Sequence, residues 1–231
     1  MNNSSTLSLQ LEQGILNLGL TLTPLQKDAL LNFLQLLQKW NQVYNLTAVR
    51  DPQEMLTHHL LDSLSAISPL GHYLQRIQQA DGSCLKLLDV GSGGGLPGVV
   101  FAICFPDLLV HCVDAVAKKV AFVQQVAAVL KLSNLKGIHT RVESLVQSYD
   151  IVSCRAFASL VDFTSWSRSA IAPDGVWLAM KGKSPNEEIA GLNPEQVDVF
   201  HVEPLQIPGL AVERCLVWMK PVVQTSTLAC T

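Results

Sequence analysis

The stretch LLDVGSGGGLPG, residues 87–98, decides the fold of this chain. It joins a short apolar run, typical of a buried strand, to a glycine-rich loop and then to a helix that starts near Pro97. A loop in this position lies at the carboxyl edge of a parallel sheet, where ligands bind. Four of the five residues from Gly91 to Gly95 are glycine, which costs more conformational entropy than a tight turn requires. The pattern therefore predicts a loop that approaches a cofactor closely.

Two classes of cofactor use a loop of this kind. Dinucleotide-binding sheets carry G-x-G-x-x-G, whereas the spacing here is G-x-G-x-G and Leu96 stands where the third glycine belongs. Asp89 is unusual beside two phosphates, while the cationic sulfonium of S-adenosylmethionine tolerates a nearby carboxylate. The loop, with Gly91 and Gly93 as cofactor-binding residues, favours S-adenosylmethionine. Asp114 ends the next expected strand, where a carboxylate accepts hydrogen bonds from ribose hydroxyls in either class.

The rhythm after residue 84 is an alternation of β-rich and helical runs. The expected strands are 86–90, 108–114, 137–143, 150–156 and 176–182, followed by 197–207 and 212–220. Strands alternating with helices imply a parallel sheet covered on both faces, and the last two runs, joined by a Pro-Gly turn, predict an antiparallel hairpin. The expected fold class is therefore α/β, a Rossmann-like, doubly wound, seven-stranded sheet with a C-terminal antiparallel hairpin.

Helical patterns precede the sheet. Thr23-Pro24 predicts an N-cap and a first helical turn, and Asp51-Pro52 with Glu54 predicts a second helix start of the capping-box type. Four residues at helical spacing form the expected buried stripe of that second helix, namely Leu56, Leu60, Leu64 and Ile67. The polar stretch 75–83 marks the boundary. We expect residues 1–83 to be an N-terminal helical cap of the same domain and residues 84–231 to carry the cofactor site.

Composition excludes several classes of protein. Of the 231 residues, 48% are hydrophobic and 15% are charged, which excludes disorder over most of the length. The net charge of −3 argues against a generally basic nucleic-acid coat. Yet residues 115–183 hold nine bases against four acids, a local excess of +5, and residues from 184 onward hold two against six. A basic patch of that size can hold a few phosphates.

Membrane, export and metal signals are absent from the sequence. No apolar stretch approaches the roughly 18 residues that a membrane span needs, and the amino terminus has no basic residue before an apolar run. The six cysteines form no C-x-x-C and no zinc spacing with histidine, so we expect free thiols. The expectation is a cytoplasmic, metal-free monomer that does not bind a membrane.

Five blocks together resemble one known family. They are YNLTAVRDPQEML (44–56), HHLLDSL (58–64), LLDVGSGGGLPG (87–98), SCRAFASL (153–160) and MKG (180–182). Their order and spacing, from about Lys39 to Lys183, are similar to those of the RsmG (GidB) family of bacterial 16S ribosomal RNA guanine-N7 methyltransferases. One departure is Cys154, which separates Ser153 from Arg155. The resemblance implies a class I methyltransferase fold and S-adenosylmethionine as methyl donor.

The resemblance also assigns cofactor-binding residues. It places Gly91 and Leu96 in the cofactor loop, Val142 and Glu143 on the adenine side, and Arg155 in the wall near the methionine portion. From the strand pattern we expect Glu143 to end the third strand. The implied partner is 16S ribosomal RNA, within the small subunit or an assembly precursor, and not DNA.

The implied chemistry asks little of the protein. The lone pair of guanine N7 is already nucleophilic, so it attacks the sulfonium methyl in line without a general base or a covalent enzyme intermediate. Catalysis is then chiefly alignment of donor and acceptor. Cys154 lacks the preceding proline of a cytosine-C5 methyltransferase, so we do not expect it to be a nucleophile. No residue is a certain catalytic group, and the candidates are Asn45, Arg155 and Lys181.

Candidates for RNA binding are Arg50, His59, Lys181 and Lys183. Lys181 is favoured because it ends the fifth strand, where functional loops gather. Asn45 and Thr47 suit either a base edge or a turn. His59 and Asp62 share one helix flank, and we expect them to pair and to orient the helix against the sheet. His58 is expected to face solvent on the opposite side.

Three alternatives remain open from the sequence. The first is a class I methyltransferase that acts on a different RNA, on a protein or on a small molecule. The second is an NAD-dependent oxidoreductase, against which Leu96 argues. The third is a ribosome-assembly factor that keeps the fold without catalysis.

Overall fold

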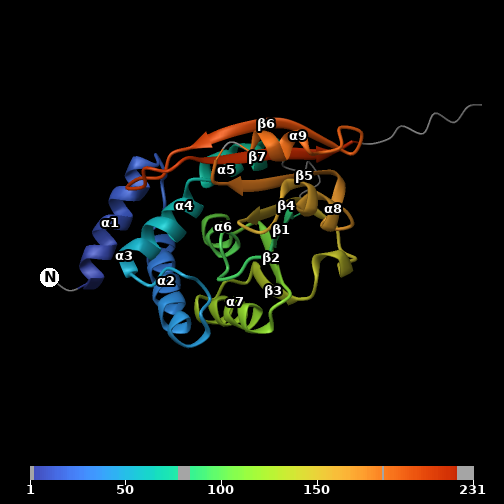
Figure 1. Ribbon diagram of the computed structural model, residues 1–231. Coiled ribbons are helices and arrows are strands. Elements are labelled where there is room, and N and C mark those ends of the chain that lie inside the picture. The colour runs from blue at the N-terminus through green and yellow to red at the C-terminus, as the bar shows by residue number, and fades with distance from the viewer. Residues whose placement is uncertain (1–2, 78–83, 184, 223–231) are drawn as a thin grey trace, which may run out of the picture.

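The structure, a computed structural model, describes residues 3–77, 84–183 and 185–222 (Figure 1). Its centre is a seven-stranded sheet in the order β3-β2-β1-β4-β5-β7-β6. The strands are β1 (Lys86–Val90), β2 (Leu109–Asp114), β3 (Leu135–His139), β4 (Tyr149–Arg155), β5 (Ile171–Lys181), β6 (Val197–Leu205) and β7 (Arg214–Pro221). β1 to β5 pair in parallel, while β7 pairs antiparallel with both β5 and β6. The predicted doubly wound sheet and terminal hairpin are confirmed.

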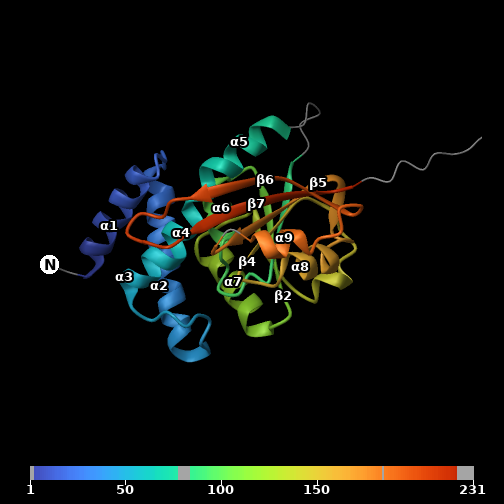
Figure 2. The same ribbon diagram turned by 45° about the horizontal axis from the view of Figure 1, so that its top comes forward.

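Helices cover both faces of the sheet. They are α1 (Asn3–Asn17), α2 (Pro24–Tyr44), α3 (Pro52–Met55), α4 (Asp62–Leu64), α5 (Ile67–Ile77), α6 (Gly98–Cys104), α7 (Ala117–Val129), α8 (Leu160–Trp166) and α9 (Asn186–Ala190), with a π-helical η1 (Leu56–Leu61) and a 3-10 turn η2 (Val142–Ser144). Figures 1 and 2 show α1 to α4 gathered at one end of the sheet. Because β1 is covered on both faces, Leu87 and Leu88 are both fully buried.

The cap and the sheet share one hydrophobic core. Phe33 of α2 lies 6.2 Å from Phe122 of α7 between ring centroids, and Trp40 lies 5.4 Å from the same ring. Buried leucines of α1 and α2 belong to the same cluster as Val99 and Phe101 of α6. The cap therefore packs on one face of the sheet. The expected boundary at 75–83 falls largely on residues 78–83, which lie outside the described residues.

The two predicted helix starts are present. Thr23 caps α2 with a complete capping box in which its side chain accepts from the Gln26 backbone, and the Gln26 side chain also donates to the carbonyls of Ile103 and Cys104 at the end of α6. Asp51 caps α3, accepting from two backbone N–H groups. The N-caps thus begin their helices and, in α2, also dock the helix on its neighbour.

The second cap helix differs from the regular helix that we predicted. Its middle is the π-helical segment η1, six residues long, before α4 resumes regular geometry. The buried stripe of Leu56, Leu60, Leu64 and Ile67 is confirmed. A π segment widens the turn, and His58, which we expected to face solvent on the far side, is half-buried and lines a cavity. Local periodicity could not show this insertion.

Three strand and helix bounds also differ from the prediction. β3 ends at His139, so Glu143 lies in the 3-10 turn η2 instead of ending the third strand. β5 begins at Ile171, five residues before the expected start, because the Pro173-Asp174-Gly175 turn lies within an irregular part of the strand. Within the described ranges no helix has the length and apolar character to cross a membrane.

Helix α1 was not predicted. Leu7, Leu11 and Ile15 recur every four residues and are buried, and the Gln10 side chain donates to Thr57 of η1 at 3.4 Å. The many Ser, Asn and Gln residues between them hide this stripe in a composition typical of a loop. Helix α1 therefore supports η1 from outside.

We predict that Leu11→Ala lowers the free energy of unfolding by about 2–5 kcal/mol, as expected for a leucine deleted from a core. Leu11 is 1% exposed and Leu9 on the same helix is 62% exposed, so Leu9→Ala is the matched control and should change stability by less than about 0.5 kcal/mol. Denaturant unfolding of both variants measures this. Equal effects would contradict the docking of α1.

Candidate functional site

The glycine loop after β1 is held against the end of β2. Gly91, Gly93 and Gly95 have positive φ angles of 65°, 56° and 78°, a conformation that side chains disfavour. The backbone N–H of Gly91 donates to the Val113 carbonyl at 2.9 Å, and that of Gly93 donates to the Asp114 carboxylate at 3.1 Å. The loop is therefore preformed.

Close packing also requires glycine at position 91. A Cβ there would overlap the ring of Phe157, which contacts Trp166 edge to face at 5.8 Å. Phe157 follows Ala156, a non-glycine residue with a φ of 51°. The loop after β4 thus lies against the loop after β1. Because β1 and β4 are neighbours on opposite sides of the point where the strand order reverses, this is the switch point at which doubly wound sheets bind ligands.

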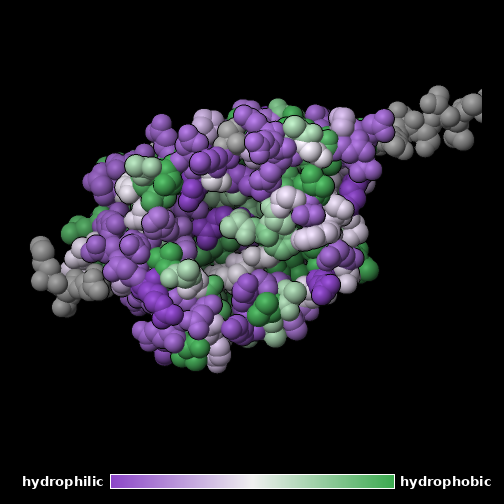
Figure 3. Space-filling view, viewed as in Figure 1, coloured by the Kyte–Doolittle hydropathy of each residue, from purple (hydrophilic) through white to green (hydrophobic). Residues whose placement is uncertain are grey.

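Two adjoining cavities open around these loops. The first, about 530 Å³, lies between the cap and the ends of β1, β4, β5 and β7, and the second, about 480 Å³, lies over the ends of β1 and β2. Both are lined by Gly91, Lys119 and Ala156. Figure 3 shows a hollow in the middle of the corresponding face, with strongly hydrophilic side chains on its cap side. Each volume is typical of a small-molecule site.

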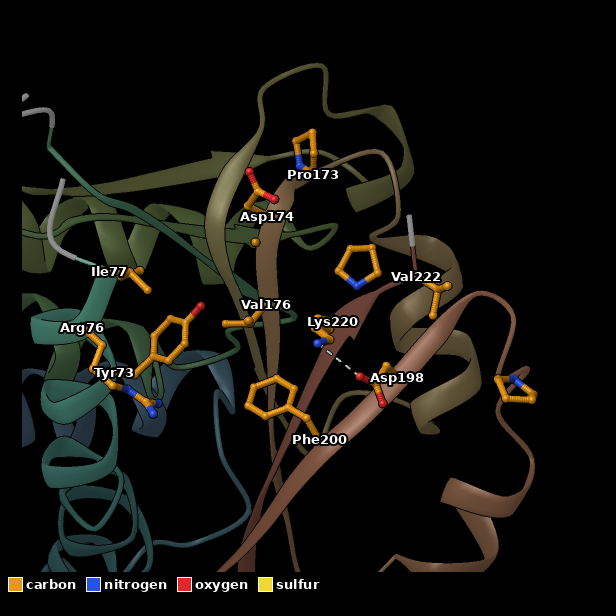
Figure 4. Close-up of a pocket in the computed structure, with 13 residues that line it drawn as sticks. Tyr73, Arg76, Ile77, Pro173, Asp174, Val176, Asp198, Phe200, Lys220 and Val222 are labelled. Carbon is orange, nitrogen blue, oxygen red and sulfur yellow. Dashed lines mark ion pairs between the residues drawn. The ribbon is translucent and has the colours of Figure 1, made fainter. Parts of the chain in front are cut away.

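A larger cavity of about 810 Å³ lies at the other edge of the sheet (Figure 4). It is bounded by α5, by the start of β5 and by the paired ends of β6 and β7. Its Lys220 and Asp198 side chains form an ion pair at 3.3 Å, and Lys220 lies over the Phe200 ring. This edge carries the amino ends of the parallel strands, so the two smaller cavities occupy the edge where ligands bind.

The second cavity holds the predicted adenosine-side residues. Asp114 accepts hydrogen bonds from the backbone N–H groups of Gly93 and Val116 and lies 3.4 Å from the Lys119 ammonium. Val142 and Glu143 of η2 line the same cavity. The structure thus brings these residues together with Gly91, even though Glu143 reaches the site from a 3-10 turn and not from a strand end.

Asp89 lies beneath the loop and lines neither cavity. Its carboxylate is fully buried and accepts hydrogen bonds from the Gly98 backbone at 3.0 Å and from the Ser153 hydroxyl at 3.1 Å. Burial raises the pKa of Asp89 to about 7. Its role in the structure is to join the loop after β1, the start of α6 and strand β4.

The first cavity contains two arginines that share one carboxylate. Arg155, at the end of β4, donates from Nη1 to Asp62 Oδ2 at 2.8 Å and to the His58 carbonyl at 3.0 Å. Arg214, at the start of β7, donates from Nε to Asp62 Oδ1 at 2.9 Å. Asp62 is buried. Sequence reasoning missed Arg214, although the hairpin prediction combined with a strand register would have set it beside the end of β5, where Cys215 faces Lys181.

The expected pair of His59 and Asp62 is wrong. His59 Nε2 lies 2.8 Å from the Thr47 hydroxyl instead, and Asp62 takes the two arginines. Burial, with the nearby charge of Arg155, lowers the pKa of His59 to about 4, so its ring is neutral near pH 7. Thr47 and His59 both line the first cavity.

The basic candidates occupy different places. Lys181 lines the first cavity, but its ammonium donates to the Ala158 carbonyl at 2.8 Å and to Glu188 at 2.7 Å. Asn45 ends α2 in a left-handed conformation and accepts from Arg50 at 2.8 Å. Neither Asn45 nor Arg50 lines the two cavities, and Lys183 is exposed outside them. Of the predicted set, Arg155, His59 and Lys181 therefore meet at the first cavity.

Within the described residues no group of His, Cys, Asp and Glu side chains is arranged to hold a metal ion. The five cysteines described there are free thiols. Cys154 is buried at the end of β4, and burial raises its pKa well above the usual value.

The strand order, the reversed β7 and the glycine loop at the switch point define a class I, S-adenosylmethionine-dependent methyltransferase. The crystal structure of TrmN from Thermus thermophilus has a similar fold, with a TM-score of 0.50 and 16% identity over 66% of this chain and 48% of that chain. At this identity the likeness concerns the fold alone.

Sequence comparison identifies the family. The GidB model, rRNA small subunit methyltransferase G, matches residues 26–217. A ribosomal RNA small subunit methyltransferase G of Acidovorax sp. (strain JS42) is 65% identical, covering 92% of this chain and 94% of that protein. The protein of the same name from Paracidovorax citrulli (strain AAC00-1) is 63% identical, covering 94% and 91%. The chain belongs to the rRNA small subunit methyltransferase G family.

We predict that Gly91→Ala weakens S-adenosylmethionine binding at least tenfold, because the new methyl group must displace Phe157 from between the two cavities. Gly19→Ala is the matched control, since Gly19 has a φ of +66° with nothing within 4 Å of an added Cβ. Both variants carry the left-handed strain of about 1–2 kcal/mol, and only Gly91→Ala carries the overlap. Calorimetric titration decides, and equal affinities would contradict the packing argument.

We predict that His59 makes stability depend on pH. Its pKa in the folded chain, about 4, lies below its ordinary value of 6.5, so the unfolded chain binds more protons and stability falls as the pH falls from 6.5 toward 4. Between pH 7 and pH 5 the loss amounts to about 2 kcal/mol. Urea unfolding should show this slope in the wild type and in His201→Gln, an exposed histidine, and a flatter slope in His59→Gln. An unchanged slope in His59→Gln would refute the assignment.

Proposed function

We propose that this protein transfers a methyl group from S-adenosylmethionine to N7 of a guanosine in 16S ribosomal RNA. Family membership supports an rRNA substrate. The two cavities that share one glycine loop support a donor and an acceptor held side by side. An RNA of the small ribosomal subunit places the reaction in the cytoplasm.

The observation that carries the choice of acceptor atom is the chemistry of the first cavity. Its one carboxylate, Asp62, uses both oxygens to bind arginines, and its buried histidine, His59, faces a hydroxyl. Lys181 is paired with Glu188. Among the residues that the structure describes, none of these lining groups is poised as a general base. A guanine N7 needs none, because its lone pair is in the ring plane and carries no proton.

The residues of the loop and the second cavity fit S-adenosylmethionine. Gly91 and Gly93 offer a cradle that a Cβ would fill, with Leu96 buried behind it. We assign the ribose hydroxyls to Asp114, the adenine to Val142 and Glu143, and the methionine end to Arg155. When bound, this cofactor supplies an electrophilic methyl group on a sulfonium.

The protein then contributes position more than acid–base chemistry. Phe157 and Ala156 separate the two cavities, and the Lys181–Ala158–Glu188 contacts hold the loop that carries them. Glu188 also accepts from the Leu160 backbone at 2.7 Å, at the start of α8. Fixing donor and acceptor in line contributes up to about 7–11 kcal/mol in ideal cases. The clamped loop is the element that keeps this alignment.

The decisive experiment supplies methyl-labelled S-adenosylmethionine with small subunits, naked 16S RNA, DNA or free guanosine. We expect label in RNA, mapped to one N7-methylguanosine by chemical cleavage, and none in DNA. Label in protein or free nucleoside alone would support a different acceptor class. No label in any acceptor, with the cofactor bound, would indicate a non-catalytic assembly factor.

We predict that kcat is flat between pH 6 and pH 9, since no group with a pKa in that range has to lose a proton for N7 to attack. Cys154→Ser, at a buried thiol, should retain activity, whereas Arg155→Ala should raise the KM for S-adenosylmethionine. A rise of kcat by tenfold per pH unit would require a base and would contradict N7 as the acceptor atom.

A further inference from the structure

The positive charge in the first cavity is not evenly compensated. Lys119 faces Asp114 at 3.4 Å and Lys181 faces Glu188 at 2.7 Å, so each lysine has its own carboxylate. Arg155 and Arg214 share the single carboxylate of Asp62. His59 adds no charge near pH 7, because burial keeps its ring neutral. The one surplus positive charge of these groups therefore lies at the arginine pair.

The two arginines differ in their distance from the cofactor loop. Arg155 ends β4, the direct neighbour of β1, and Arg214 begins β7, which is separated from β4 by β5. With strands about 4.8 Å apart, β7 lies about 14 Å across the sheet from β1. Arg214 stands instead beside Gly182, on the far side of the first cavity. This is the side where the acceptor, not the donor, has room.

Arg214 also retains a donor for a ligand. Its Nε donates to Asp62 and its Nη1 donates to the Glu213 carbonyl at 3.0 Å. Among the described residues, Nη2 meets no acceptor. The Arg214 side chain is 28% exposed and that of Arg155 is 17% exposed. A guanidinium fixed by a buried carboxylate and open on one side is suited to an anion.

We propose that Arg214, oriented by Asp62, binds a backbone phosphate of the RNA next to the target guanosine. This inference rests on the proposed function. A phosphate suits the site better than the base edge does, because an arginine on guanine contacts O6 and N7 together and would cover the atom that must face the methyl donor. A phosphate at Arg214 leaves N7 free and places negative charge near the base as it becomes cationic.

Asp62 is then a positioning residue. Its buried carboxylate lies between two like charges that would otherwise repel, and it fixes the plane of each guanidinium. It touches neither the donor nor the acceptor in this proposal. Its effect passes through Arg155 toward the cofactor and through Arg214 toward the RNA.

The test compares Arg214→Ala and Arg214→Lys with Lys220→Ala, which removes an exposed base from the same strand. S-adenosylmethionine affinity is measured by calorimetry, and the KM for small subunits or 16S RNA by methyl transfer at several salt concentrations. For Arg214→Ala we expect a KM at least tenfold higher, a cofactor affinity within twofold of wild type and a log–log salt slope smaller by about 0.7–0.9. Arg214→Lys should recover part of the KM, and Lys220→Ala should match the wild type.

Asp62→Asn provides the second arm, with thermal unfolding to verify folding. It should weaken both cofactor and RNA binding, because it loosens both arginines. If wild-type protein methylates RNA and Arg214→Ala keeps the wild-type KM, the phosphate site is refuted while the proposed function stands. If Arg214→Ala instead weakens the cofactor as Arg155→Ala does, Arg214 belongs to the donor. A wild type that labels no RNA refutes the proposed function itself.

Discussion

Asp62 places one buried carboxylate between two guanidinium groups that arrive from β4 and β7, while its own backbone belongs to the helical cap. Three segments far apart in the chain meet at this point. Removing one partner of such a buried pair costs about 3–5 kcal/mol, because it leaves a charge uncompensated in a poorly solvated place. The geometry of the first cavity depends on this contact, since the cap wall and the ends of both strands are joined by it.

The sheet was predictable because its signals are local. Apolar runs such as those around Leu87 and Val152, punctuated by glycine and proline, specify buried parallel strands without reference to the rest of the chain. The glycine loop was predictable for the same reason, since positive φ and close packing exclude other residues at Gly91. Helix α1 and the π-helical η1 were not, because their signal is a contact with another element: the Gln10–Thr57 bond has no trace in local periodicity.

The candidate site divides along the same line. The resemblance and the loop pattern indicated Gly91, Asp114, Val142, Glu143 and Arg155, which the structure gathers around the two cavities. Charge alone could not rank the remaining bases. Arg50 bonds to Asn45 away from the cavities, Lys181 is held by Glu188, and Arg214 was missed. Which carboxylate each base meets depends on tertiary packing, and that decides whether its charge is available to a ligand.

The π-helical segment η1 has a consequence for how the chain tolerates length changes. Six residues with a widened turn precede Asp62, and each residue of a regular helix corresponds to a rotation of about 100°. Losing one residue between Leu56 and Leu61 would restore ordinary helical geometry locally. It would also turn everything downstream by about that angle, and the Asp62 carboxylate would leave the plane in which two arginines reach it. The irregular turn thus acts as a phase adjuster that sets the angular position of one side chain relative to a sheet built almost a hundred residues later.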